Sequence, residues 1–324
     1  MSEADIINLI NNAIDFSPTK TNKSPELKVI DIREFLTIEL PPREQLLSPI
    51  IPTQGLVMIY AARGIGKTFV SLSIATAVAS GSNMFADKWI CEKPHKVLFI
   101  DGEMPATVLQ ERLSSIVAGL SVDSYQSENL KIITPDLQER GIPDLATLDG
   151  QELIEMHLDG VELLILDNLS SLCRTGRENE SESWLPIQEW LLSLRKRNIS
   201  VLIIHHAGKG GNQRGNSKKE DLLDTVIALK KPGNYEQKDG ARFEVHYEKA
   251  RGFHGDEAKP FEATIVDDNG VIVWVIKEIE DSLIEQVIEL HNEEMSQREI
   301  GLELGISASK VNRLLKKAKS DGKL

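Results

Sequence analysis

The chain has 324 residues, of which 41% are hydrophobic and 27% charged, a composition typical of a globular protein with about two domains. Its formal net charge of −13 argues against non-specific nucleic-acid binding by the chain as a whole. Two cysteines, Cys91 and Cys173, are too few for a disulfide scaffold or a cysteine-rich zinc module and fit a reducing cytoplasm. The polar amino-terminal residues predict no signal peptide, and the absence of any run of about 18 apolar residues predicts no contact with a membrane.

The first part of the chain alternates between two kinds of pattern. Residues 1–45 are expected to form an amino-terminal segment and linker, with one helix from Ala4 to Ile14, and the four prolines of residues 41–52 exclude regular structure throughout that stretch. Beyond it, short apolar runs typical of strands buried on both faces alternate with amphipathic helical patterns. Strands are expected at 55–60, 96–101, 162–167 and 200–205, and helices at 67–80, 105–119 and 182–197. This alternation predicts an α/β fold with a mostly parallel twisted sheet.

The second part predicts the edge of this sheet and a separate helical unit. Two further strands are expected at 224–230 and 242–249, and a hairpin across the Asp-Asn-Gly turn within 261–276. Three short helical patterns follow, at 282–294, 296–304 and 308–319. We therefore expect one large domain over 46–278 and a small all-α domain over 281–324.

A phosphate-binding motif lies at the end of the first predicted strand. The sequence AARGIGKT (61–68) matches [AG]-x4-G-K-[ST] and opens the first predicted helix, the context that such a loop requires. Glycines let backbone N–H groups converge on phosphate oxygens, the helix terminus adds positive charge, Lys67 reaches the β- and γ-phosphates and Thr68 binds Mg²⁺. The other interpretation is a glycine-rich turn with a surface lysine. We expect ATP with Mg²⁺ to be bound by Arg63, Gly64, Ile65, Gly66, Lys67 and Thr68.

Carboxylates follow two other predicted strands. The run ELLILD ends in Asp167, the position of a Walker B acid, which is expected to hold Mg²⁺ together with Thr68. The run KVLFIDGEM places Asp101 and Glu103 where a group is needed to activate water for hydrolysis. We favour Glu103 for that role and Asp101 for its support. Ordinary strand-terminal or solvated loop acids are the alternatives.

These motifs together resemble the RecA-like core of hexameric replicative helicases, above all the RepA-type plasmid helicases and related AAA_25-like ATPases of phages and mobile elements. The resemblance covers roughly residues 30–275 and rests on PPREQLLSPIIP, AARGIGKT, VLFIDGEM, LLILDN, IIHHAGKGGNQRG and EKARG. It implies a RecA-like fold, ATP hydrolysis and a homo-oligomer, with a hexamer favoured. In that group the catalytic glutamate follows the second strand, which supports Glu103.

The resemblance also implies roles for residues at two other strand ends. His205 would sense the γ-phosphate, with His206 slightly less favoured. Lys249 and Arg251 would reach the γ-phosphate of the neighbouring subunit, so that the ATPase would need the oligomer. A polar strand edge and a pair of surface cations are the other interpretations.

Two segments are candidates for binding DNA. In RecA-like rings the loop equivalent to 207–219 lines a central channel and grips single-stranded DNA through cations; here these would be Lys209, Arg214, Lys218 and Lys219. The alternative is a solvated basic loop. Residues 295–324 look like a helix-turn-helix, in which Ser296 and Glu299 form a capping box. Within 305–324 six basic residues face one acid, a local charge of +5.

The outward positions of the last predicted helix form a candidate recognition surface for duplex DNA: Ser309, Lys310, Asn312 and Arg313. An amphipathic helix pair used for packing or for contact with an acidic protein is the alternative. The sequence therefore predicts an ATP-driven motor on DNA. Two other hypotheses are an ATP-gated DNA-binding regulator or loader without unwinding activity, and an ATP-binding structural ring or filament.

Overall fold

The computed structural model describes residues 27–120, 127–175, 181–208 and 221–324. The chain divides into two compact units, Met1–Pro42 and Arg43–Leu324. In the first unit, α2 (Ile32–Thr37) begins at Asp31, whose carboxylate accepts a hydrogen bond of 2.9 Å from the Glu34 backbone N–H. The helix that the sequence predicts from Ala4 to Ile14 lies outside the described residues.

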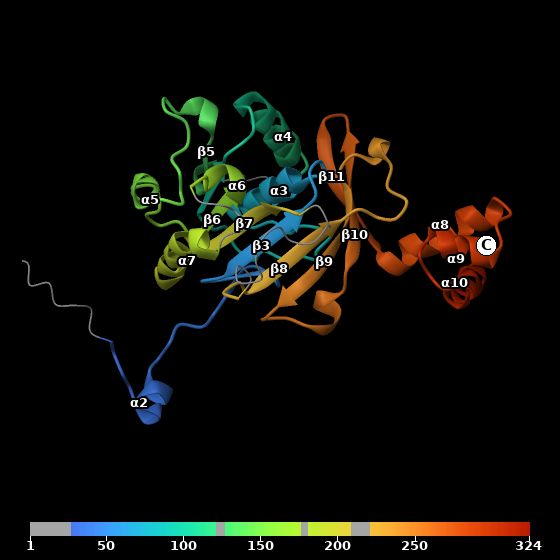
Figure 1. The fold of residues 1–324 in the computed structure, drawn as a ribbon, viewed down its shortest axis with the longest axis horizontal. Coiled ribbons are helices and arrows are strands. Elements are labelled where there is room, and N and C mark those ends of the chain that lie inside the picture. Colours follow the sequence, from blue (N-terminus) through green and yellow to red (C-terminus); the bar gives the residue numbers. More distant parts are fainter. Residues whose placement is uncertain (1–26, 121–126, 176–180, 209–220) are drawn as a thin grey trace, which may run out of the picture. The chain divides into compact units, whose positions relative to one another are not determined.

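The second unit is built on a mixed sheet (Figure 1), whose strand order in the described residues is β11-β10-β9-β8-β3-β7-β6-β4-β5. Six neighbouring strands are parallel: β3 (Leu56–Ala61), β4 (Val97–Asp101), β5 (Leu130–Ile133), β6 (Leu163–Asp167), β7 (Ser200–His206) and β8 (Thr225–Lys230). Three antiparallel strands complete one side: β9 (Arg242–Ala250), β10 (Phe261–Asp268) and β11 (Val271–Glu278). The predicted α/β class with a mostly parallel sheet is confirmed.

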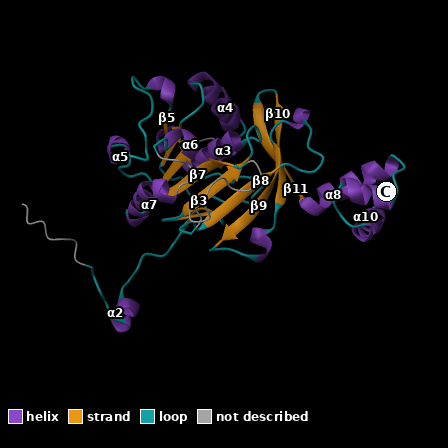
Figure 2. Cartoon of the chain, in the orientation of Figure 1, coloured by secondary structure: helices purple, strands orange, loops and turns teal. Residues whose placement is uncertain are grey.

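Helices cover both faces of the parallel strands (Figure 2). One face carries α3 (Lys67–Ser80) and α4 (Ala106–Ala118), and the other carries α5 (Leu148–Glu155), α6 (Leu169–Leu172) and α7 (Ser181–Lys196). Alternate residues of β3 point to opposite faces of the sheet, since Val57 belongs to the apolar core that includes α3, whereas Met58 belongs to the core that includes α7. This two-sided burial explains why the central strands are continuously apolar.

The parallel strands bring their carboxyl ends to one edge of the sheet, where ligands bind in open α/β folds. Asp101 at the end of β4 is in register with Asp167 at the end of β6. Ala61 at the end of β3 is likewise in register with His206 at the end of β7. Residues far apart in sequence therefore meet beside the loop that connects β3 to α3.

Three helices form the carboxyl-terminal part: α8 (Ile279–Asn292), α9 (Gln297–Glu303) and α10 (Ala308–Ser320). They share an apolar core that includes Ile284, Ile300 and Leu314, each 0% exposed. The predicted capping box of Ser296 and Glu299 is present, with hydrogen bonds of 2.8 and 3.3 Å between them. Each helix in the described part of the chain is too short or too polar to span a lipid bilayer.

Most of the predicted strands are present in the structure, and the elements that were not predicted are short. The predicted hairpin is formed by β10 and β11, which join at Asn269 and Gly270 with positive φ angles of 56° and 86°. The proline-rich stretch contains a small antiparallel pair, β1 (Gln45–Leu47) and β2 (Ile51–Pro52). The sequence patterns did not predict the short elements α2, β1, β2, β5, α5 and α6.

Candidate functional site

The loop between β3 and α3 has a backbone that only glycine adopts without strain at two positions. Gly64 and Gly66 have φ angles of 75° and 109°, in the region that other residues avoid. A side chain at Gly66 would also bring its Cβ within 2.7 Å of the Ala241 Cβ. Ile65 between them is 0% exposed and fixes the loop to the core. Only the backbone of Ile65 is therefore available to a ligand.

Lys67, the first residue of α3, has a buried ammonium group. Its Nζ donates hydrogen bonds to the carbonyl oxygens of Ala61 (3.0 Å) and Ala62 (2.8 Å). Burial lowers the pKa of Lys67 to about 8, against the opposing effects of Asp167 and Glu103. Because burial disfavours its charge, the ammonium would gain from an additional anion beside it, as a phosphate group would provide.

Asp167 is held in place by hydroxyl groups of α3. The Ser71 hydroxyl donates to Asp167 Oδ2 at 2.6 Å. Burial raises the pKa of Asp167, whereas the hydrogen bonds from the Ser71 and Thr68 hydroxyls lower it. A carboxylate next to a threonine hydroxyl is the oxygen donor set that suits Mg²⁺, so the residues present fit this ion. Ser71 was not among the residues predicted from the sequence, although its position about one helical turn after Thr68 indicated that it could reach the same site.

Asp101 lies beside Asp167 and supports the turn that carries Glu103. It is 2% exposed, and its Oδ2 accepts a hydrogen bond of 2.9 Å from the Met104 backbone N–H. Burial raises the pKa of Asp101 to about 6, with a further contribution from the charge of Asp167. Glu103 itself projects outward, with half of its side chain exposed.

The histidine that lines the cavity is His206, whereas the sequence slightly favoured His205 for sensing the γ-phosphate. His206 Nε2 lies 3.7 Å from Glu103 Oε1, and burial and the charge of Lys67 lower the pKa of His206. Among the described residues neither ring nitrogen of His206 has a hydrogen-bond partner, although the residue is only 8% exposed. His205 is 0% exposed and points to the opposite face, because neighbouring residues of a strand alternate between faces.

A cavity of about 600 Å³ joins these groups. Its lining contains the loop glycines, Lys67 and Thr68, the acids Glu103 and Asp167, and His206. It also contains residues that the sequence analysis did not single out or did not place here: Phe69, Arg112, Asn168, Gly240 and Ala241. Arg63, which the sequence analysis did predict, is exposed and lines the same cavity.

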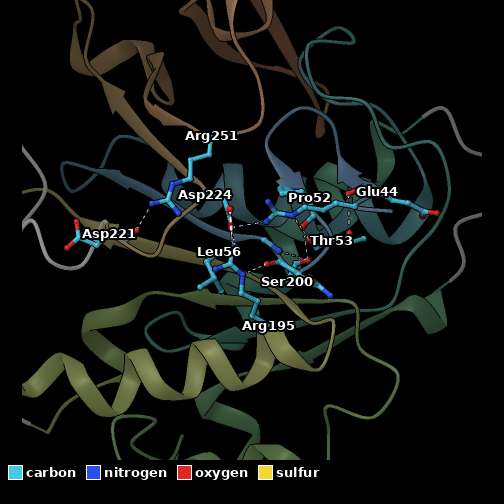
Figure 3. A network of polar contacts seen from close by, with 12 residues as sticks. Glu44, Pro52, Thr53, Leu56, Arg195, Ser200, Asp221, Asp224 and Arg251 are labelled. Atoms are coloured by element: carbon cyan, nitrogen blue, oxygen red, sulfur yellow. Dashed lines mark hydrogen bonds and ion pairs between the residues drawn. The ribbon is translucent and has the colours of Figure 1, made fainter. Parts of the chain in front are cut away.

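Lys249 and Arg251 lie at the other edge of the sheet. β9 runs antiparallel to β8, and Ala250 pairs with Thr225, which in turn pairs with Val57 near the start of β3. Figure 3 shows the guanidinium group of Arg251 directed toward Asp221. Both cations donate to the carbonyl oxygen of Asp221, Arg251 at 2.7 Å and Lys249 at 3.4 Å. The length of β3, about 20 Å, separates them from the phosphate loop of their own chain.

A buried carboxylate organises this second edge (Figure 3). Asp224 is 4% exposed and accepts hydrogen bonds from the Leu56 N–H (3.0 Å) and from Arg195 Nη2 (2.8 and 3.1 Å). The guanidinium group of Arg43 lies 3.0 Å from the same carboxylate, and the Arg251 N–H donates to the Asp224 carbonyl at 3.0 Å. One acid thereby joins β3, β8, α7 and the end of β9.

The predicted DNA-binding residues fall into two groups. Lys209, Arg214, Lys218 and Lys219 lie outside the described residues. On α10 the side chains expected to face outward are exposed: Ser309, Lys310, Asn312 and Arg313. Glu280 of α8 pairs with Lys317 at 2.9 Å and approaches Arg313 at 3.8 Å, so part of the positive charge of α10 is balanced within the three helices.

The parallel sheet and the phosphate loop with its two acids define a P-loop ATPase with a RecA-like core. Residues 21–212, more than half of the chain, match the model of the family AAA_25, described as an AAA domain, and the chain belongs to this family. The fold is similar to the crystal structure of a KaiC-like protein from the hyperthermophilic archaeon Pyrococcus horikoshii, with a TM-score of 0.51 and 17% identity over 72% of this chain and 100% of the other. No curated protein matches the sequence.

The raised pKa of Asp101 predicts how its replacement changes stability with pH. The pKa of Asp101 is 3.8 in the unfolded chain and about 6 in the folded protein. Between these two pH values Asp101 is protonated in the folded protein and ionised in the unfolded chain. The stability from this proton is fully present below pH 3.8 and is lost as the pH rises through about 6. Asp101→Asn, which keeps an oxygen for the Met104 N–H, is expected to raise the free energy of unfolding by about 1–3 kcal/mol at pH 7.5.

Urea denaturation at a series of pH values measures this effect. The advantage of Asp101→Asn over wild type is expected to shrink as the pH falls from 7.5 to 5. Asp159→Asn, at an exposed position, is the control and is expected to show little change at any pH. A difference between Asp101→Asn and wild type that stays constant with pH would contradict the assignment.

Proposed function

We propose that the protein hydrolyses ATP and works on DNA as an oligomeric RecA-like ATPase, as a replicative helicase of the RepA type does. The observation that carries the ATPase part is the convergence of Lys67, Asp167 and Glu103 on one cavity beside a glycine-shaped loop. The family supports this part, because RecA-like P-loop ATPases in general use ATP and Mg²⁺. DNA binding is supported by basic residues, and formation of an oligomer is supported by the position of Lys249 and Arg251.

ATP would be bound through its phosphates by the backbone of residues 63–68 and by the Lys67 ammonium. Thr68 and Asp167 would hold Mg²⁺, which neutralises phosphate charge when bound. The tight loop brings successive N–H groups toward one point, and the amino terminus of α3 adds partial positive charge there. This part of the proposal depends on groups that already lie within one cavity.

Glu103 would orient and deprotonate the attacking water. Its carboxylate is exposed to the cavity, on a turn braced by the Asp101–Met104 hydrogen bond. His206 would sense the γ-phosphate in the place first expected of His205. Its ring nitrogens are buried without a hydrogen-bond partner among the described residues, and a nitrogen of the neutral ring can donate to a phosphate oxygen.

Lys249 and Arg251 would complete the cavity of a neighbouring subunit. They lie at the edge opposite their own phosphate loop, so a role at a γ-phosphate requires a second copy of the chain. A ring joined head to tail places these two different edges against each other. We favour a hexamer.

DNA would be bound in two places. Lys209, Arg214, Lys218 and Lys219 would track the phosphates of a single strand in the central channel. The helices α9 and α10 would act as a helix-turn-helix, with Ser309, Lys310, Asn312 and Arg313 facing duplex DNA. Support comes from the exposure of these four side chains and from a turn at Gly305, where φ is 63°.

The second candidate function is an ATP-gated DNA-binding regulator or loader that does not unwind DNA. It is favoured by the three carboxyl-terminal helices, which have an apolar core of their own and would direct the protein to a site on duplex DNA. A strand-displacement assay with ATP separates the two functions. Unwinding supports the helicase, and ATP hydrolysis with DNA binding but without unwinding supports the regulator.

Glu103→Gln is expected to lower the rate of ATP hydrolysis by at least about 100-fold, because the amide cannot accept the proton of the attacking water. Binding of ATP is expected to persist, since the phosphate loop is unchanged. Glu111→Gln, an exposed position on α4, serves as the control and should hydrolyse at the wild-type rate. Wild-type hydrolysis by Glu103→Gln would show that another group activates the water.

A mixing experiment tests the action of Arg251 between subunits. Glu103→Gln and Arg251→Ala are each expected to be inactive, but a 1:1 mixed oligomer should regain up to about a quarter of wild-type activity. The reason is that an interface between unlike subunits can take an intact residue from each. Glu103→Gln mixed with Asp167→Asn, which both alter the same cavity, should regain nothing. Failure of the first mixture to recover, with co-assembly verified, would contradict the proposal.

The double variant Lys310→Ala with Arg313→Ala is expected to weaken binding of duplex DNA at least tenfold, because two exposed cations of α10 are lost. The salt dependence of the affinity should fall with it. Lys131→Ala on β5 removes an exposed cation elsewhere and should have little effect. An unchanged affinity in the double variant would remove α10 as the recognition helix.

A further inference from the structure

One main-chain carbonyl holds the two cations at the amino edge of the sheet. The carbonyl oxygen of Asp221 accepts hydrogen bonds from Arg251 Nη2 at 2.7 Å and from Lys249 Nζ at 3.4 Å. The bond to Arg251 uses one of the five N–H donors that a guanidinium group carries. The Asp221 carbonyl can therefore orient Arg251 and leave other donors of the same group for a phosphate.

The segment that carries this carbonyl is tied to two strands at Asp224, three residues further on. The Asp224 N–H donates to the Leu56 carbonyl at 2.7 Å, and the Leu56 N–H donates back to the Asp224 carboxylate at 3.0 Å. The Asp224 carbonyl accepts a hydrogen bond of 3.0 Å from the Arg251 N–H. Asp224 thus fixes the start of β3, the backbone of Arg251 and the approach to the Asp221 carbonyl in one arrangement.

The charge of Asp224 is held between two guanidinium groups (Figure 3). Arg195 Nη2 lies 2.8 Å and Arg43 Nη2 lies 3.0 Å from the Asp224 carboxylate, whose side chain is 5% exposed. Each arginine is fixed a second time, because Arg195 Nε donates to the Gln54 carbonyl and Arg43 Nε to the Thr53 carbonyl, both at 3.0 Å. Charge-assisted hydrogen bonds are strong and directional at buried sites, so this carboxylate has a narrowly defined position.

We propose that Asp224 is a positioning residue for Lys249 and Arg251: it fixes the Asp221 carbonyl that orients both cations toward the γ-phosphate bound by the neighbouring subunit. This inference rests on the proposed action of the two cations between subunits. Asp224 would touch no nucleotide and would act through the cations. Loss of its charge should therefore lower kcat and leave the affinity of the same chain for ATP unchanged, because β3 separates Asp224 from the phosphate loop.

Steady-state hydrolysis and titration calorimetry with ATP and Mg²⁺ measure these two quantities separately. Asp224→Asn is expected to lower kcat at least about tenfold and to leave the affinity for ATP within about twofold of wild type, because misplaced catalytic groups lose rate rather than binding. Glu44→Gln, which removes the carboxylate of the exposed Glu44–Lys93 ion pair, is the control and should match wild type in both. A wild-type kcat in Asp224→Asn would overturn the proposal.

Mixed oligomers show on which side of the subunit interface Asp224 acts. Asp224→Asn mixed 1:1 with Glu103→Gln should regain up to about a quarter of wild-type activity, because one interface in four takes an intact residue from each subunit. Asp224→Asn mixed with Arg251→Ala should regain nothing, since both variants alter the same edge. With co-assembly verified, the reverse pattern would overturn the proposal and assign Asp224 to its own nucleotide cavity.

Arg43→Gln provides a second, milder variant, because Asp224→Asn leaves two guanidinium groups without their anion and can unfold the chain. The side chain of Arg43 is 43% exposed, and Arg195 remains on the carboxylate. This variant is expected to lower kcat about threefold, with ATP affinity retained. Wild-type kcat in Arg43→Gln, together with an unfolded Asp224→Asn, would overturn the proposal.

Arg251→Ala separates failure of this inference from failure of the proposed function. If Arg251→Ala is inactive while Asp224→Asn and Arg43→Gln hydrolyse ATP as wild type does, the positioning role of Asp224 is wrong and the action of Arg251 stands. If wild type does not hydrolyse ATP, or if Arg251→Ala hydrolyses it at the wild-type rate, the corresponding part of the proposed function fails together with this inference.

Discussion

The ammonium group of Lys67 lies buried at the point where β3 turns into α3, and the neighbouring charges are arranged around it. Two carbonyl oxygens of the loop accept its hydrogen bonds, and Asp167 and Glu103 favour its charged form. Burying charges is costly unless they are paired and hydrogen-bonded. Burial lowers the pKa of Lys67 and raises those of Asp101 and Asp167, so all three groups carry their charge at a cost that a phosphate with Mg²⁺ would offset.

The sheet separates two polar edges that the proposed function uses differently. At the carboxyl edge, Lys67, Asp167, Glu103 and His206 line one cavity. At the amino edge, Asp224 joins the strands and the end of α7, and Arg251 is anchored on the Asp221 carbonyl. A single copy cannot bring these edges together, because β3 keeps them apart. The proposal of a ring follows from this separation.

The sequence predicts what depends on local patterns. Continuous apolar runs locate β3, β6 and β7 because these strands are buried on both faces, and the phosphate loop is identified because its glycines and Lys67 are consecutive. The sequence could not decide between His205 and His206, because the choice depends on which face of β7 meets the cavity, a matter of one residue in register. β5 was not predicted because none of its four residues is fully buried and Lys131 is exposed.

Other features could not be predicted from the sequence, because they join residues that are far apart along the chain. Asp224 is paired with Arg43 and Arg195, and no local pattern connects these positions. Arg112 is one of two charged residues on α4, and only the packing of α4 against α3 places it beside Phe69. Ser71 lies within a largely buried helix. The role of its hydroxyl group becomes clear only from the structure, in which Asp167 lies beside it.

The measurement that tests the central claim most directly is the affinity of Lys67→Ala for ATP with Mg²⁺, compared with wild type and with Lys88→Ala, an exposed lysine on the same unit. The account predicts that Lys67→Ala binds at least about 100-fold more weakly, or about 2.7 kcal/mol, while Lys88→Ala binds as wild type does. Equal affinity of Lys67→Ala and wild type would contradict the claim that a triphosphate lies against the Lys67 ammonium.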